Sequence, residues 1–252
     1  MMMLTIAGRE LRSLFVSPLA WSILAVVQLI LAYMFLTQLD VFMMLQSRLL
    51  GIEGAPGVTE IIVAPMLGGA AMVLLLVVPL LTMRLVSEER RGQTLSLLFS
   101  APISMTEIVL GKFFGVMGFL LIMVLMIMLM PLSLLAGADL DFGVLAAATL
   151  GLVLLLASFA AVGLFMSTLT EQPTVAAVSS FGVLLLLWIV DWAGDSNAEQ
   201  ASELFAYLSL LRHFQSLLQG VFNSSDVIYY LLFVAVFLIL SIRRLDADRL
   251  QH

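Results

Sequence analysis

Residues 64–136 read APMLGGAAMVLLLVVPLLTMRLVSEERRGQTLSLLFSAPISMTEIVLGKFFGVMGFLLIMVLMIMLMPLSLLA. Two apolar runs, 64–83 and 113–136, flank a loop that carries every charged residue of this stretch. A helix needs about 20 apolar residues to cross the hydrocarbon core of a bilayer. The stretch therefore predicts two membrane-spanning helices joined by a polar loop.

Further apolar runs lie on both sides of this stretch. With the first two they predict six spans, at residues 19–39, 64–83, 113–136, 142–166, 174–192 and 226–242. The composition agrees, since 62% of residues are apolar and 11% are charged, against about 45–50% and about 25% in soluble domains. Two alternatives stay open: one span is re-entrant, or the third and fourth form a shallow hairpin. The expected fold class is an all-α integral membrane protein, with residues 1–252 as one domain in a lipid bilayer.

The basic residues predict the orientation. With the N-terminus inside, all eleven Lys and Arg residues except Arg48 and Arg212 fall on the cytoplasmic side. Lys and Arg near span ends favour the cytoplasm, whereas Asp and Glu have little effect. We therefore expect both termini in the cytoplasm.

The sequence lacks the motifs of a self-contained enzyme. It has no cysteine and only two histidines, and His213 is expected to be a surface residue. Lys112 follows a glycine, but Thr106 stands where a phosphate-binding loop needs its first glycine. The net charge of -6 argues against a nucleic-acid partner. The spans also lack the ionisable residues that mark ion-coupled carriers. No catalytic residue, bound cofactor or metal is expected on this chain.

The loop between the second and third spans predicts an ordered helix. Ser87 is placed to cap it, and Glu88 and Glu89 fall in its first turn, where the helix dipole favours negative charge. Pro102 disfavours helical geometry at the residue before it, so the helix is predicted over residues 87–101. Its apolar edge consists of Leu95, Leu98 and Phe99. Alternatively, the loop lies at the membrane interface and its charges only set the topology.

Three other features lie around this loop. Ser104 and Glu107 have the spacing of a capping box, which predicts the start of the next helix. Residues 1–18 suit a helix along the inner membrane interface. Residues 194–225, outside, place apolar residues on one helical face, and this segment either rests on the outer surface or dips into a cavity mouth. Gln28, the most central polar residue of the spans, either lines a pathway or hydrogen-bonds to a neighbouring helix.

The loop sequence resembles the permease subunits of ABC-2 type transporters, in particular the gliding-motility-associated branch. The matching residues are Ser87, Glu88, Glu89, Arg90, Arg91, Thr94, Leu95, Leu97, Leu98, Ser100, Ala101, Pro102, Ile103, Ser104, Glu107, Ile108, Val109, Leu110, Gly111 and Lys112. A second matching patch consists of Leu208, Ser209, His213, Phe214, Gly220, Val221, Asp226, Val227 and Tyr229. The chain departs from the family pattern at Gly92-Gln93-Thr94 and at Ser96.

The resemblance implies a permease subunit in the bacterial cytoplasmic (inner) membrane. It would pair with a second permease copy, more often identical than different, beneath separate ABC ATPase subunits that hold ATP and Mg²⁺. Residues 1–18 would be an elbow helix and region 84–107 the coupling region. Contacts with the ATPase would come from Ser87, Glu88, Glu89, Arg90, Arg91, Thr94, Leu95, Leu98 and Pro102.

The resemblance also implies how the subunit would work. Pro79 and Pro131 are candidate hinges in the second and third spans, although each can equally be an ordinary membrane proline. The expected function is ATP-driven export of a hydrophobic or amphiphilic substrate. In the alternative, the assembly moves no substrate and transmits force to an extracytoplasmic accessory protein or membrane partner.

Overall fold

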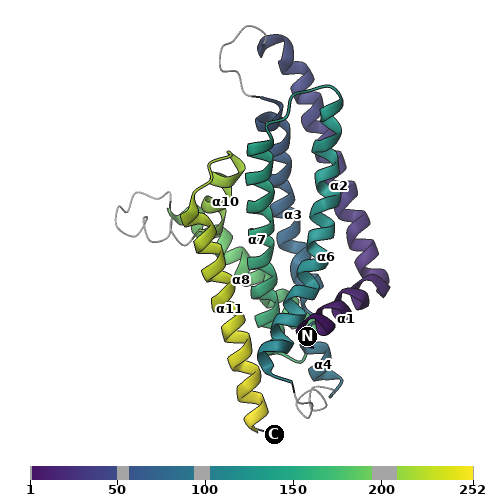
Figure 1. Cartoon of the computed structure of the whole chain (residues 1–252), viewed down its shortest axis with the longest axis vertical. Helices are drawn as coiled ribbons and strands as arrows, with labels where there is room; N and C mark the ends of the chain where they lie inside the picture. Colours follow the sequence, from purple (N-terminus) through teal and green to yellow (C-terminus); the bar gives the residue numbers. More distant parts are fainter. Residues whose placement is uncertain (1, 50–56, 94–102, 195–208, 252) are drawn as a thin grey trace.

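The computed structural model describes residues 2–49, 57–93, 103–194 and 209–251, and this part of the chain is helical without strands. Five long helices run roughly side by side (Figure 1). They are α2 (Pro18–Leu49), α3 (Ala64–Thr82), α6 (Met105–Ser133), α7 (Phe142–Leu169) and α11 (Ser224–Gln251). The other elements are α1 (Met2–Val16), η1 (Thr59–Val63), α4 (Ser87–Arg91), η2 (Leu134–Ala136), α8 (Pro173–Gly194) and α10 (Leu210–Leu218).

The predicted all-α membrane fold is confirmed in its main features. Five described helical segments are long and apolar enough to cross a bilayer: Pro18–Gln46, Thr59–Arg91, Met105–Ser133, Phe142–Leu169 and Ser224–Arg249. They contain the first, second, fourth and sixth predicted spans in full and residues 113–133 of the third, whose last three residues form η2. The apolar helix at the fifth predicted span, Pro173–Ile189, is shorter. Its crossing therefore stays a prediction, as does the orientation of the whole chain.

Helix α7 forms the centre of the bundle. Its most apolar window is 67% buried, whereas the corresponding windows of α2 and α11 are 28% and 33% buried. Helix α7 packs against α3, α6, α8, α10 and α11. Small residues permit this close packing: a Cβ added at Gly163 would lie 2.0 Å from Thr82 Oγ1 of α3. The peripheral helices α2 and α11 therefore present the most apolar surface outward.

One end of the bundle holds both chain ends together with α1 and α4 (Figure 1); we call it the α4 end. There α1 lies across α6, with two α6 glycines beneath it. A Cβ added at Gly111 would lie 2.8 Å from Ile6 Cβ, and one added at Gly115 would lie 2.6 Å from Glu10 Cβ. Helix α1 covers most of predicted segment 1–18, while its place at a membrane interface stays a prediction.

The predicted helix over residues 87–101 is corrected by the structure. Helix α4 ends at Arg91, because Gly92 leaves helical geometry (φ -79°, ψ 1°) and Gln93 has a φ of +53°. Glycine is a poor helix former, and one residue of positive φ is enough to turn the chain away from the helix axis. The predicted coupling residues Thr94, Leu95, Leu98 and Pro102 lie outside the described residues.

The capping box that precedes the third span is confirmed. Ser104 Oγ accepts a hydrogen bond from the Glu107 backbone N–H at 3.2 Å, and the Ser104 N–H donates to Glu107 Oε2 at 3.3 Å. Helix α6 consequently begins at Met105. Lys112 is the eighth residue of this helix and directly precedes the predicted span 113–136.

At the opposite end, helix α10 lies within the predicted outer segment 194–225, of which residues 195–208 lie outside the description. It packs into the bundle, since a Cβ added at Gly151 of α7 would lie 2.9 Å from Leu217 Cβ and 3.3 Å from Phe214 Cδ2. Gly151 is about 13 Å along α7 from its first residue, at 1.5 Å per residue. Helix α10 therefore packs against the central helix, while its outer location and its place at a cavity mouth stay predictions.

Candidate functional site

A buried serine fixes the position at which α4 begins. Ser167 Oγ of α7 accepts hydrogen bonds from the backbone N–H groups of Val86 and Ser87, each at 3.0 Å, and donates to the Met83 carbonyl at 3.0 Å. The turn between α3 and α4 would otherwise leave these backbone groups without partners in a buried place. Helix α4 is thereby attached to the central helix of the bundle.

Ser87 itself does not have the predicted capping role. It is the first residue of α4 and is fully buried, and its hydroxyl donates to the Met83 carbonyl one turn earlier. The serine side chain bonds backward to a carbonyl one turn earlier, the same carbonyl that Ser167 contacts, rather than forward to an amide.

Glu89 of α4 points into the protein and meets a buried lysine. Lys112 Nζ of α6 donates to Glu89 Oε1 at 2.7 Å and to Glu10 Oε1 of α1 at 2.9 Å. The Lys112 side chain is only 2% exposed. Arg9 Nη2 lies 3.7 Å from Glu89 Oε1, but its side chain is 62% exposed, so solvent weakens this third interaction. Glu89 thus links α4 to α6 and, through Lys112, to α1.

Arg90, the next residue, reaches the other side of the bundle. Its Nη2 donates to the Thr168 carbonyl at the end of α7 at 2.9 Å and forms an ion pair with Asp248 of α11. Arg244, one turn earlier on α11, lies 3.5 Å from the same carboxylate. Two neighbouring residues of α4 therefore connect it to helices that are far apart in the sequence.

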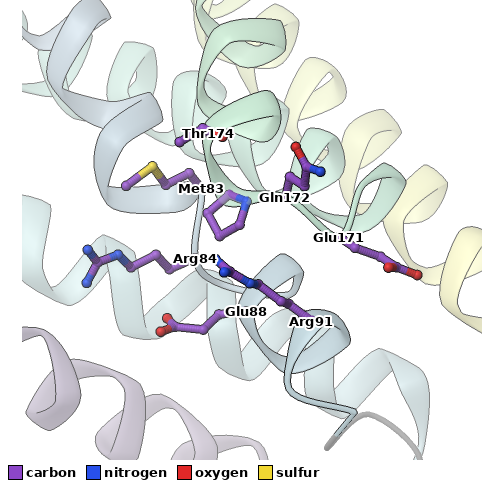
Figure 2. A pocket seen from close by; sticks show the side chains of 8 residues that line it. Met83, Arg84, Glu88, Arg91, Glu171, Gln172 and Thr174 are labelled. Atoms are coloured by element: carbon purple, nitrogen blue, oxygen red, sulfur yellow. The ribbon is translucent and has the colours of Figure 1, made fainter.

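Glu88 and Arg91 have a different environment, because both are exposed. They line a hollow of about 620 Å³ together with Met83, Arg84, Glu171, Gln172, Pro173 and Thr174. Figure 2 shows Arg84 and Glu88 extending to one side of this hollow and Glu171 to the other, with the Arg91 side chain directed toward the middle. Within the described part of the chain, these four charged residues make no ion pair. We call them the free-charge set of the α4 end.

The remaining predicted site residues lie inside helices. Pro79 and Pro131 are both buried, within α3 and α6 respectively, and their role as hinges stays a prediction. Gln28 Nε2 of α2 is buried and has no hydrogen-bond partner among the described residues. This nitrogen therefore does not make the alternative helix–helix hydrogen bond, and a place on a pathway stays a prediction.

A second polar cluster, at the opposite end of the bundle, was not predicted. His213 of α10 is only 9% exposed, so the prediction of a surface residue is wrong. Its Nδ1 lies 2.7 Å from Asp226 Oδ1 of α11, and the Tyr229 ring stacks on it at 4.2 Å. Tyr230 donates from its hydroxyl to the Leu210 carbonyl at 2.6 Å. Histidine and aspartate both occur in the second matching patch, and this was the available signal that they meet.

A hollow of about 600 Å³ is lined in part by α10. Its lining combines η1 and α3 with α10, through Glu60, Ala64, Pro65, Gly68, Gln215, Leu218 and Gln219. Among the described residues, no group of three or more His, Asp or Glu side chains is arranged to hold a metal ion. The chemistry available at both ends is thus charge pairing and hydrogen bonding.

The comparisons with known proteins identify the family. A family model described as "ABC-2 family transporter protein" matches residues 4–250, which is nearly the whole chain. The comparison with curated proteins found no match. The narrower resemblance to the gliding-motility-associated branch stays a prediction. The chain belongs to the ABC-2 transporter family, which makes it a membrane permease subunit and implies an ABC ATPase as its partner.

Proposed function

We propose that this chain is half of an ATP-driven exporter and that a separate ATPase subunit docks on the free-charge set of the α4 end. The observation that carries the proposal is the division of charges on α4. Glu89 and Arg90 are paired inside the chain, whereas Glu88 and Arg91 face a hollow without ion-pair partners among the described residues.

This division fits a docking surface better than a loop whose charges only set the topology. A topology signal needs basic residues near a span but no particular arrangement of acidic ones. Here side chains of both charges line one hollow: the basic Arg84 and Arg91 and the acidic Glu88 and Glu171. Charge-complementary surfaces of mixed sign give a partner a defined register and exclude wrong partners.

The ATPase would then supply the chemistry. ATP and Mg²⁺ would be bound on that subunit, and this chain would contribute α4 as the element that receives the movement. Glu89 and Arg90, which the sequence alone placed among the ATPase contacts, would act within the chain. They would hold α4 to α1, α6, α7 and α11 while Glu88 and Arg91 contact the partner.

The proposed substrate is hydrophobic or amphiphilic. Each described candidate span has a window with no more than two charged residues, so a strongly charged substrate would find few counter-charges on its way. Charged groups inside a membrane are stable only when paired or hydrated. A single subunit would form half of the path, so we propose a dimer, preferably of identical chains. Native mass spectrometry of the purified complex would test this state.

Reconstitution with the co-purifying ATPase tests the function. ATP-driven uptake of a fluorescent lipid analogue into inside-out vesicles would support export. ATPase activity that responds only to an extracytoplasmic accessory protein, without uptake of any amphiphile tested, would favour force transmission instead. Proton-driven flux in the absence of ATP would contradict both.

A further inference from the structure

Lys112 is a buried charge to which docking of an ATPase assigns no role. Its side chain is 2% exposed, and its ammonium group contacts two carboxylates from different helices. Glu10 lies 102 residues before it, on α1, and Glu89 lies 23 residues before it, on α4. Three helices of the α4 end therefore meet at one ammonium group.

Helices α1 and α4 differ in how closely they pack against α6. Helix α1 lies directly on α6, with Ile6 over Gly111 and Glu10 over Gly115, where no Cβ would fit without a shift. Interiors packed this closely move as units. Helix α4 approaches the same place through the Glu89 side chain. Separation of α4 from α6 would break the 2.7 Å contact and leave a buried ammonium with one carboxylate fewer, which is unfavourable in a low-dielectric environment.

Helix α1 is in turn attached to the first span. Only Ser17 separates α1 from α2, and the Ser17 N–H donates back to the Ser13 carbonyl at 3.2 Å. Trp21 Nε1 of α2 donates to the Phe15 carbonyl of α1 at 2.8 Å, and the Phe15 and Trp21 rings meet edge to face at 5.8 Å. Because of these contacts, a movement of α1 would also move the start of α2.

We propose that Lys112 is a joint through which α1, and with it the first span, follows displacements of α4. Lys112 is a positioning residue in this scheme, since it acts through Glu10 and Glu89. The inference rests on the proposed function, in which the ATPase moves α4. Movement of α4 would reach α3 and α6 directly, because these helices flank α4 in the sequence. The inference adds α2 to the helices that the ATPase would move.

The first test uses the chain alone in lipid nanodiscs. Because the chain contains no cysteine, spin labels can be placed at Gly8→Cys on α1 and Gly92→Cys just after α4. Both positions are exposed. Electron–electron double resonance then gives the distance distribution between the two labels. We expect one narrow distribution in the parent chain.

The decisive variant neutralises the whole joint: Glu10→Gln, Glu89→Gln and Lys112→Met together. Replacement of all members of a buried charge cluster is tolerated far better than removal of one, because no charge is left unpaired. We expect this triple variant to lose the narrow distribution. The matched control, Arg90→Gln with Asp248→Asn, neutralises the other anchor of α4 and is expected to keep it. A triple variant with the parental distribution would overturn the joint.

The second test adds the co-purifying ATPase and compares nucleotide-free and ATP-bound states. A reference label at Gly57→Cys, an exposed position with open space around it, reports the movements of Gly8→Cys and Gly92→Cys separately. In the parent, ATP is expected to shift both distances. In the triple variant the Gly92 shift is retained and the Gly8 shift is lost. A Gly92 shift without a Gly8 shift in the parent would overturn the joint. No Gly92 shift at all would contradict the proposed function, and the first test would still decide the joint.

Discussion

Glu88→Gln and Glu89→Gln change neighbouring residues of α4 in the same way, yet they should affect the stability of the fold differently. Glu89 has a side chain that is 20% exposed and lies 2.7 Å from the Lys112 ammonium. Glu88 is exposed and makes no ion pair among the described residues. We therefore expect Glu89→Gln to destabilise the fold and Glu88→Gln to leave it unchanged.

The magnitude follows from the contacts of Lys112. Loss of a hydrogen bond to a charged group costs about 1.5–3 kcal/mol. A buried charge left entirely alone would cost about 3–5 kcal/mol, but Lys112 keeps its 2.9 Å contact with Glu10. The expected loss for Glu89→Gln is therefore about 1.5–3 kcal/mol. A substitution at an exposed residue such as Glu88 should stay within about 0.5 kcal/mol.

Unfolding in mixed micelles of mild detergent and increasing dodecyl sulfate, followed by tryptophan fluorescence, measures this difference directly. The chain has three tryptophans, and both variants carry the same change of charge, so each is the control for the other. Unfolding of both variants at the parental midpoint would refute the reasoning that Glu89 is paired inside the protein. A midpoint lowered by Glu88→Gln alone would refute the division of charges on α4.

Three further predictions concern the rest of the fold. An impermeant thiol reagent applied to intact cells should label Asn223→Cys but not Arg249→Cys, because basic residues place the C-terminal end inside; the reverse labelling would invert the topology. Gly163→Ala should lower stability by about 1–3 kcal/mol by overpacking against α3, whereas Gly182→Ala, with open space around it, should be neutral or slightly stabilising; equal midpoints in the same micelle assay would argue against the close contact of α3 and α7. Asp226→Ala should lower the free energy of unfolding by about 1–3 kcal/mol, because its buried histidine partner loses a hydrogen bond; an unchanged unfolding midpoint would show that the pair does not hold α10.

The sequence predicted the features that depend on local patterns. Apolar runs of span length located the long helices, because burial of backbone groups in lipid leaves few structures other than helices. The capping box of Ser104 and Glu107 was predictable because both partners lie within one turn. The end of α4 at Arg91 was not predicted. Gly92 is a poor helix former, but the capping and apolar pattern of residues 87–101 indicated a longer helix.

The ionic contacts of the α4 end could not be predicted in the same way. Glu10 and Lys112 meet only because α1 folds back across α6, and Arg90 meets Asp248 only because α11 returns to α4. Such pairs depend on the packing of whole helices and leave no local pattern in the sequence. The burial of His213 was missed for the same reason, since an amphipathic helix has the same periodicity whether it covers a surface or dips into a bundle.

The most direct test of the docking surface is the affinity of the ABC ATPase for the double variant Glu88→Ala, Arg91→Ala. The matched control, Arg12→Ala with Asp246→Ala, also removes one charge of each sign from exposed positions of the α4 end. Truncation of one partner of a buried charge pair costs about 2–5 kcal/mol, which weakens binding by at least about 30-fold. The account predicts that loss for the α4 variant and parental affinity for the control. Parental affinity for both would contradict docking on α4.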